Sequence, residues 1–241
     1  MTNLEKLKIK IFADGADIDS ISKLNTKSYI KGFTTNPSLM KKAGVNDYKE
    51  FALKLLSKIQ DKPISFEVFS DDLLEMEKQA NEIASWGKNV NVKIPITNTK
   101  KESTIGIIER LSHQGIECNI TAIFTTNQLN SVVKSLNKNT PAILSIFAGR
   151  IADTGIDPEN IMSECVKIAQ SRPKSEILWA STRELVNIFQ ADKIGCQIIT
   201  VPHEILSKID SIGKNLEEYS LDTVKSFYQD AVAAGFKINL K

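Results

Sequence analysis

The stretch VNVKIP, at residues 90–95, carries a single lysine, Lys93, inside an otherwise apolar run that ends on a proline. Its length, its valine and isoleucine content and its polar flanks are typical of a buried strand. Because side chains alternate along a strand, Val90, Val92 and Ile94 share one face and Lys93 lies on the other. Taken alone, the stretch fits an edge strand with an exposed lysine that guards against aggregation. The second interpretation is a lysine in an enclosed pocket, where desolvation favours the neutral, nucleophilic amine.

The segments on either side of this strand are predicted to be helices, because their apolar residues recur at spacings of three and four. They are DLLEMEKQANEIASW before the strand and STIGIIERLSHQG after it. The whole chain repeats this alternation, and its eight strand-like runs are KIKIFAD, YIKGFTTN, PISFEVF, VNVKIPI, IECNITAIF, AILSIFAG, EILWAS and QIITVP. Other helical patterns are DYKEFALKLLSKI, NQLNSVVKSL, ENIMSECVKIAQSR and TRELVNIFQ. Eight alternating units predict an α/β fold, a single (β/α)8 TIM barrel.

We expect one domain over residues 1–241, because no linker rich in proline, glycine or serine divides the chain. An additional amphipathic helix is predicted at residues 221–236, beyond the eighth unit. Its apolar stripe consists of Val224, Phe227, Tyr228, Ala231 and Phe236. This helix either packs on a neighbouring subunit or closes the bottom or side of its own barrel, which is the simpler arrangement.

Composition excludes several classes of function. The chain has 41% hydrophobic and 25% charged residues, which is ordinary for a globular protein. Its formal net charge of +2 is spread without a basic block, so nucleic acid is not an expected partner. The amino-terminal residues lack an apolar signal core, and no apolar run approaches the roughly 20 residues that span a bilayer. We therefore expect no membrane association and a cytoplasmic location.

Metal and cofactor sites have little support in the sequence. Three cysteines, an odd number, lie far apart at Cys118, Cys165 and Cys196, which argues against disulfides and a redox pair. The two histidines, His113 and His203, show neither HxH nor HExxH spacing. No glycine-rich phosphate loop is present. We expect no metal and no cofactor.

Polar side chains gather near the carboxyl ends of the predicted strands, where TIM barrels carry their chemistry. Two carboxylates and a lysine are among them, and this combination suggests imine formation: a neutral amine attacks a ketone and the iminium stabilises a carbanion. The carboxylates would serve as general acids and bases. Two arginines would bind an anionic group such as a phosphate, whose geometry guanidinium groups match, although a surface ion pair is the simpler role for either one. The polar candidates are Asp14, Thr34, Thr35, Asn36, Glu67, Lys93, Asn119, Thr121, Ser145, Arg150, Ser181 and Arg183.

The segments FADGAD, GFTTNPSLM, VKIPIT, CNITAIF, SIFAGRI and WASTRE, in this order, resemble the transaldolase family, including its small-chain branch and the related fructose-6-phosphate aldolases. By this resemblance Lys93 is the Schiff-base lysine and Asp14 the acid/base for bond cleavage. Glu67 and Thr121 position a water that shuttles protons. The resemblance further implies that hydroxyls of the substrate contact Asn36 and Ser145, with Thr34, Asn119 and Phe147 in the same site, and that the phosphate contacts Arg150, Ser181 and Arg183.

Three residues favour transaldolase within this family. Transaldolases resemble this chain in having Glu67, Asn119 and Phe147, whereas the aldolases tend to have glutamine and tyrosine at positions 67 and 147. The resemblance implies transfer of a dihydroxyacetone unit from fructose 6-phosphate or sedoheptulose 7-phosphate to an aldose phosphate, in the pentose phosphate pathway. Two departures from the family pattern, Gly15 and Thr182, leave open an altered acceptor such as a sulfonated sugar.

Two further expectations concern alternatives and partners. A catalytically silent barrel that only binds a sugar phosphate is disfavoured, because the lysine and both carboxylates are present. Sugar phosphates are the expected small-molecule partners. Small-chain relatives suggest a homo-oligomer built from rings, such as a decamer.

Overall fold

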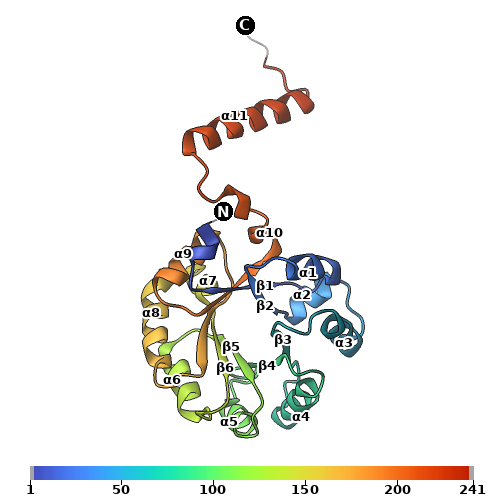
Figure 1. Ribbon diagram of the computed structural model, residues 1–241, viewed down its shortest axis with the longest axis vertical. Helices are drawn as coiled ribbons and strands as arrows, with labels where there is room; N and C mark the ends of the chain where they lie inside the picture. Colours follow the sequence, from blue (N-terminus) through green and yellow to red (C-terminus); the bar gives the residue numbers. More distant parts are fainter. Residues whose placement is uncertain (1–2, 239–241) are drawn as a thin grey trace.

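The computed structural model describes residues 3–238, in which eight parallel strands pair in sequence order and close into a barrel (Figure 1). Helices surround the barrel, so the predicted (β/α)8 fold is confirmed. Strand eight pairs with strand one and leaves no open sheet edge. The strands are β1 Lys10–Asp14, β2 Ile30–Thr34, β3 Ile64–Glu67, β4 Val90–Pro95, β5 Cys118–Ile123, β6 Ala142–Ile146, β7 Ser175–Trp179 and β8 Ile198–Pro202.

Most of the helices begin at a side-chain cap. The capping residue is an aspartate, asparagine or threonine, and such a residue before an apolar pattern predicts the start of a helix. Asp72, for example, accepts a hydrogen bond from the N–H of Glu75 at the start of α4. The predicted helix at residues 182–190 instead begins at Val186, because residues 182–185 form the turn that leaves β7. The helices are α1 Ile18–Asn25, α2 Pro37–Lys42, α3 Tyr48–Lys58, α4 Leu73–Ala84, α5 Ile105–His113, α6 Thr126–Ser135, α7 Ala148–Ala152, α8 Pro158–Ala169, α9 Val186–Lys193, α10 His203–Leu206 and α11 Leu216–Ala233.

The core has two parts. The larger one lies between the strands and the surrounding helices, where both kinds of element bury aliphatic side chains. The smaller one fills the barrel interior and contains Phe12, Ile143, Leu178, Ala180 and Ile198. The ring of Phe12 lies against Gly32, where a Cβ atom would come within 2.6 Å of it, so glycine at position 32 makes room for this ring.

Strand register places the polar candidates at one end of the barrel. Glu67 pairs with Lys93 between β3 and β4, and Lys93 pairs with Asn119 between β4 and β5. On the other side, Asp14 of β1 pairs with Thr34 of β2. Parallel strands thus bring the carboxyl ends of β1 to β5 to the same rim.

Helix α11 corrects the prediction made for the carboxyl-terminal region. It begins at Leu216, five residues earlier than predicted, because the side chain of Asn215 caps the N–H groups of Glu217 and Glu218. It ends at Ala233, before Gly235, which has a positive φ of 66°. None of its residues is buried, and it extends away from the barrel (Figure 1). The expectation that it closes its own barrel is therefore wrong.

In the described range, no helix combines the length and the apolar character that a membrane crossing requires.

Candidate active site

A cavity of about 530 Å³ opens at the carboxyl ends of the strands. It brings together all but three of the residues predicted for the site; the exceptions are Thr35, Asn119 and Arg183. The residues that line it come from all eight strands and from the segments that follow β2, β6 and β7. The predicted members are Asp14, Thr34, Asn36, Glu67, Lys93, Thr121, Ser145, Phe147, Arg150 and Ser181.

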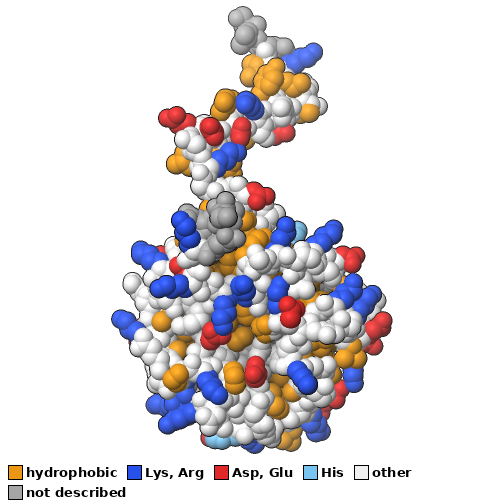
Figure 2. Space-filling model, viewed as in Figure 1, with side chains coloured by type: hydrophobic (Ala, Val, Ile, Leu, Met, Phe, Trp, Pro, Cys, Tyr) orange, Lys and Arg blue, Asp and Glu red, His pale blue; other side chains and the backbone are white. Residues whose placement is uncertain are grey.

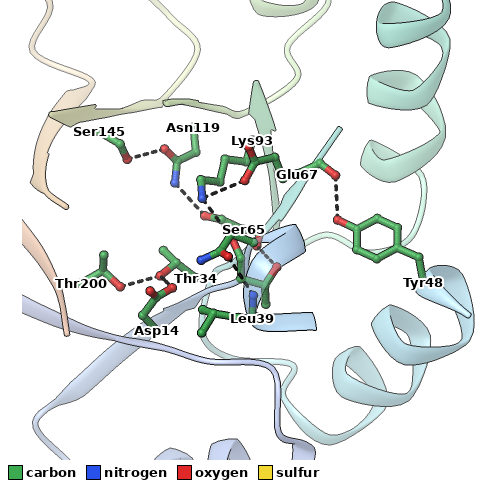
Figure 3. Close-up of polar contacts among 12 residues, drawn as sticks. Asp14, Thr34, Leu39, Tyr48, Ser65, Glu67, Lys93, Asn119, Ser145 and Thr200 are labelled. Atoms are coloured by element: carbon green, nitrogen blue, oxygen red, sulfur yellow. Dashed lines mark hydrogen bonds and ion pairs between the residues drawn. The ribbon is translucent and has the colours of Figure 1, made fainter. Parts of the chain in front are cut away.

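Lys93 is enclosed, with 8% of its surface exposed, so the interpretation of an exposed edge lysine is wrong. Its ammonium nitrogen lies 3.0 Å from Oε2 of Glu67 and donates to the carbonyl oxygen of Thr35 at 3.2 Å (Figure 3). β4 is an interior strand of a closed barrel, which removes the edge that the alternative required. A buried ammonium with a carboxylate partner can transfer a proton to that partner and become a nucleophile.

Asp14 lies on the same side of the cavity as the hydroxyls of Thr34 and Thr200. The Thr34 hydroxyl donates to Oδ1 of Asp14 at 2.7 Å, and the Thr34 and Thr200 hydroxyls also form a hydrogen bond (Figure 3). Asp14 keeps part of its surface open to the cavity, yet the surrounding protein withdraws it from bulk water. This desolvation raises the pKa of Asp14, and the nearby Lys93 and the Thr34 hydroxyl oppose the rise. Such a carboxyl is suited to accept and return a proton.

A second polar chain lies across the floor of the site. The Ser145 hydroxyl donates to Oδ1 of Asn119 at 2.6 Å, and Nδ2 of Asn119 donates to the Ser65 hydroxyl at 3.0 Å (Figure 3). Asn119 is fully buried and does not line the cavity, so it contacts Ser145 from below. The buried hydroxyl of Thr121, in contrast, has no hydrogen-bond partner in the described part of the chain. It lines the cavity and is available to a water or a substrate.

Asn36 has a local structural role as well as a place in the cavity. Its Oδ1 accepts the N–H of Leu39 at 3.0 Å and caps α2, whose first residue is Pro37. This leaves the amide nitrogen of Asn36 as the group available to a ligand.

The part of the cavity wall that follows β6 and β7 carries Phe147, Arg150 and Ser181. The guanidinium carbon of Arg150 lies 5.4 Å from the centre of the Phe147 ring. Ser181 has a φ of 62°, in the left-handed region, and its carbonyl approaches Gly149 so closely that a Cβ there would lie 1.6 Å from the oxygen. Arg150 makes this part of the cavity its cationic end.

Arg183 does not line the cavity. Its Nε donates to Oδ1 of Asp153 at 3.0 Å and its Nη2 pairs with Oδ2, in a two-pronged ion pair at the surface. The two side chains are about half exposed. The sequence interpretation of Arg183 as a surface ion pair therefore describes this structure better than direct contact with the cavity.

Among residues 3–238, no three histidine, cysteine, aspartate or glutamate side chains gather as a metal site would require. The three cysteines are buried, and desolvation raises the pKa of each thiol to about 12. They are therefore protonated and inert at neutral pH.

Sequence reasoning missed two hydroxyls of this network, on Thr200 and Ser65. Each is a small polar residue inside an apolar strand, and this break in the apolar pattern could have identified it as a candidate. Ser65 stands two positions before Glu67, on the same face of β3 by alternation. Thr200 stands in β8, the one predicted strand from which no candidate was taken.

An enclosed lysine and two carboxylates at the carboxyl ends of the strands define the chain as a (β/α)8-barrel enzyme by fold and site. Residues 11–238 match the family described as Transaldolase/Fructose-6-phosphate aldolase, and the chain belongs to this family. A protein of Thermoanaerobacter sp. (strain X514) named "Probable transaldolase" is 35% identical over 231 residues, which cover 95% of this chain and 100% of that protein.

A relative of the same name from Dehalococcoides mccartyi is 34% identical over 204 residues, which cover 83% of this chain and 90% of that protein. Among solved structures, KGPDC from Streptococcus mutans is similar with a TM-score of 0.56 at 11% identity, over 82% of this chain and 89% of that one. This last likeness concerns the fold alone.

Proposed function

We propose that the protein is a transaldolase that moves a dihydroxyacetone unit from a ketose phosphate to an aldose phosphate through a Schiff base on Lys93. Fructose 6-phosphate and sedoheptulose 7-phosphate are the proposed donors. The observation that carries the proposal is the enclosed ammonium of Lys93, 3.0 Å from the Glu67 carboxylate in a cavity of sugar-phosphate size. Membership of the family and the names of the relatives support the same general activity.

In the first step the Lys93 nitrogen attacks the C2 ketone of the donor and forms a carbinolamine. The hydroxyl on C2 then leaves as water, and an iminium remains. Glu67 accepts a proton from the amine and supplies one to the departing hydroxyl, directly or through a water held by Thr121. The ion pair with Lys93 and the free Thr121 hydroxyl support these roles.

In the second step the bond between C3 and C4 breaks. Its electron pair moves into the iminium to give an enamine, and Asp14 takes the proton from the C4 hydroxyl, which becomes an aldehyde. The aldose phosphate leaves and the acceptor aldehyde enters. The enamine carbon then attacks the acceptor, Asp14 returns its proton, and hydrolysis of the iminium frees Lys93. The raised pKa of Asp14 suits a group that must both accept and return a proton.

The remaining roles follow from the two ends of the cavity. Asn36 and Ser145 would bind hydroxyls of the three-carbon unit, near Lys93. Arg150 and Ser181 would bind the phosphate at the cationic end. Arg183 would act at long range, through the field of its ion pair with Asp153, or after exchanging Asp153 for phosphate.

Two residues that line the cavity favour transfer over simple aldol cleavage. Glu67 provides a carboxylate where a glutamine could not act as a base, and Phe147 provides no proton donor to the enamine. An enamine that is not protonated persists until an acceptor arrives. A sulfonated or otherwise altered acceptor remains compatible with this scheme.

Borohydride reduction tests the proposal. The enzyme is incubated with fructose 6-phosphate and borohydride, and peptide mapping by mass spectrometry should find a three-carbon adduct on Lys93. Addition of erythrose 4-phosphate should reduce the trapped fraction, because the acceptor removes the enamine. An adduct on another lysine, or no adduct, would falsify the Schiff-base assignment.

We further propose a homo-oligomer in which α11 docks on another copy of the chain. Helices in proteins are stabilised mainly by the packing of an apolar face, and this one exposes Leu221, Val224, Phe227, Tyr228 and Val232 with no cover from its own barrel. Figure 2 shows hydrophobic side chains gathered on this protruding part. A ring-shaped assembly such as a decamer would cover each helix in the same way.

A further inference from the structure

Tyr48, a residue outside the cavity, contacts the backbone of Glu67. Its hydroxyl donates a hydrogen bond of 2.8 Å to the carbonyl oxygen of Glu67, the last residue of β3 (Figure 3). Tyr48 is the first residue of α3, and its position is fixed by the cap that Asp47 forms at the N–H of Glu50. A helix on the outside of the barrel is thus joined to the backbone of a residue that faces Lys93.

The strand ladder explains why this carbonyl needs a partner from outside the sheet. Between β2 and β3, the N–H of Phe33 donates to the carbonyl of Pro63, and that of Thr35 donates to Ser65. The donor and the acceptor each advance by two residues along their strands, so the next bond would join the N–H of residue 37 to the carbonyl of Glu67. Residue 37 is a proline, which has no N–H and begins α2. Tyr48 therefore supplies the donor that the ladder lacks at this position.

On its other side the end of β3 is held by β4, where the N–H of Val68 donates to the carbonyl of Lys93 at 3.0 Å. Residue 67 thus sits between two anchors, one on the lysine strand and one on α3. Removal of the Tyr48 hydroxyl would leave a carbonyl unpaired at the rim and free the backbone that carries the Glu67 carboxylate.

The Tyr48 ring is itself held in place by aromatic neighbours. It meets Phe66, Phe69 and Trp86 edge to face, with ring centres 6.3, 5.4 and 5.5 Å away. Burial also raises the pKa of the Tyr48 hydroxyl, so this group remains a donor across the working pH range. The packed ring therefore holds the Tyr48 hydroxyl in position to donate to the Glu67 carbonyl.

We propose that Tyr48 is a positioning residue for Glu67: its hydroxyl fixes the backbone of residue 67 so that the carboxylate stays in contact with Lys93. This inference rests on the proposed function, in which Glu67 moves protons during imine formation. Misplacement of a reacting group by about 1 Å can lower a rate by as much as 10²-fold. Tyr48 needs no contact with substrate to have such an effect.

The test is Tyr48→Phe, which removes one oxygen and keeps the ring. We expect kcat for transfer to fall about tenfold or more, while KM changes by less than about twofold, because the substrate contacts are untouched. Tyr29→Phe is the matched control, since Tyr29 is also partly buried but precedes β2 and does not line the cavity. It should leave kcat unchanged.

A double-mutant cycle separates positioning from general loss of structure. If Tyr48 acts through Glu67, then Tyr48→Phe should slow imine formation in the wild-type background and have less than about twofold effect in a Glu67→Gln background. Equal slowing in both backgrounds, or no slowing in either, would overturn the inference. Melting temperatures of all variants show whether a variant is folded.

Borohydride trapping keeps this test apart from that of the proposed function. If the wild-type enzyme forms no adduct on Lys93, the proposed function fails, and the inference about Tyr48 fails with it. If the wild-type enzyme forms the adduct and Tyr48→Phe forms it at the same rate, the proposed function stands and Tyr48 has no positioning role. An adduct that forms in both, but more slowly in Tyr48→Phe, supports the two together.

Discussion

The nitrogen of Lys93 and Oε2 of Glu67 lie 3.0 Å apart, on residues that pair across β3 and β4. Both side chains are largely enclosed, so neither charge could be buried without the other. The Glu67 carboxylate compensates the charge of the buried Lys93 ammonium and can accept its proton. One interaction thus serves the folded state and the proposed first step of catalysis.

Lys93→Arg should abolish turnover although it keeps the positive charge, because a guanidinium stays protonated and cannot attack a ketone. We expect activity at least about 10³-fold below wild type and no adduct with borohydride. Lys62→Arg is the control, since Lys62 is a partly buried lysine that donates to the carbonyl of Asn25, outside the cavity. Turnover by Lys93→Arg within tenfold of wild type would contradict a nucleophilic lysine.

Glu67→Gln should lower transfer from fructose 6-phosphate to erythrose 4-phosphate by about 10²-fold or more, within the range for one acid/base group. Glutamine keeps the shape of the side chain but removes the base. The residual activity should shift toward release of free dihydroxyacetone, most clearly when Phe147→Tyr adds a phenolic proton donor. A coupled assay for dihydroxyacetone measures this ratio. A wild-type enzyme that already releases dihydroxyacetone as fast as it transfers it would contradict the choice of transaldolase.

Arg150→Ala should raise KM for phosphorylated substrates by roughly 10- to 10²-fold, because a charge-assisted hydrogen bond contributes about 1.5 to 3 kcal/mol. Arg183→Ala should have a smaller effect, since its guanidinium pairs with Asp153 and does not line the cavity. Neither variant should change the kinetics of unphosphorylated dihydroxyacetone. Arg110→Ala is the control, because Arg110 forms a similar two-pronged pair with Glu77 elsewhere. Equal losses on both kinds of substrate would indicate a structural role.

Asp14→Asn should abolish bond cleavage and yet stabilise the fold. Burial raises the pKa of Asp14 in the folded state, so the ionised carboxylate destabilises the fold increasingly as the pH rises above about 3.8. The variant should gain about 1 to 3 kcal/mol in the free energy of unfolding at pH 7 and nothing below about pH 3.8. Urea unfolding at fixed protein concentration, at several pH values, measures the difference.

Asp17→Asn is the control for this pH dependence, because hydrogen bonds from Ser20 lower the pKa of Asp17 at the start of α1. Its contribution to stability has the opposite sign: it is present above the unfolded pKa and is lost as the pH falls through the folded one. A gain for Asp14→Asn that does not vary with pH would contradict desolvation as the cause.

Phe227→Asp combined with Tyr228→Asp should dissociate the proposed oligomer, because both side chains are exposed on the apolar stripe of α11. Light scattering after size-exclusion chromatography should show a smaller particle. Ser226→Asp places the same charge on the opposite face of the helix and should leave the mass unchanged. A monomeric wild-type protein would contradict the assembly without affecting the barrel.

The fold could be predicted because every strand of a parallel barrel is buried on both faces and therefore appears as a short apolar run between amphipathic helices. Lys93 stands out against such a run, and so does Glu67. Strand order then brings both to one rim, which is why most of the site could be assembled from positions alone.

The rest depends on contacts that no local pattern encodes. Arg183 pairs with Asp153, 30 residues away in the sequence, so the sequence alone could not decide between a surface ion pair and a place in the cavity. The hydrogen bond from Tyr48 to Glu67 depends on where α3 begins relative to β3. The apolar stripe of helix α11 has the same sequence pattern whether the helix covers its own barrel or protrudes. The pattern does not specify which surface packs against the stripe.

Gly149 limits how the protein could be redesigned for other sugars. No side chain fits between its Cα and the carbonyl of Ser181, where a Cβ would lie 1.6 Å from the oxygen. A directed-evolution library for this cavity should therefore keep glycine at this position and vary Phe147 or Leu39, which line the open space. Variants that use a new acceptor must therefore retain Gly149 and change other residues of the cavity.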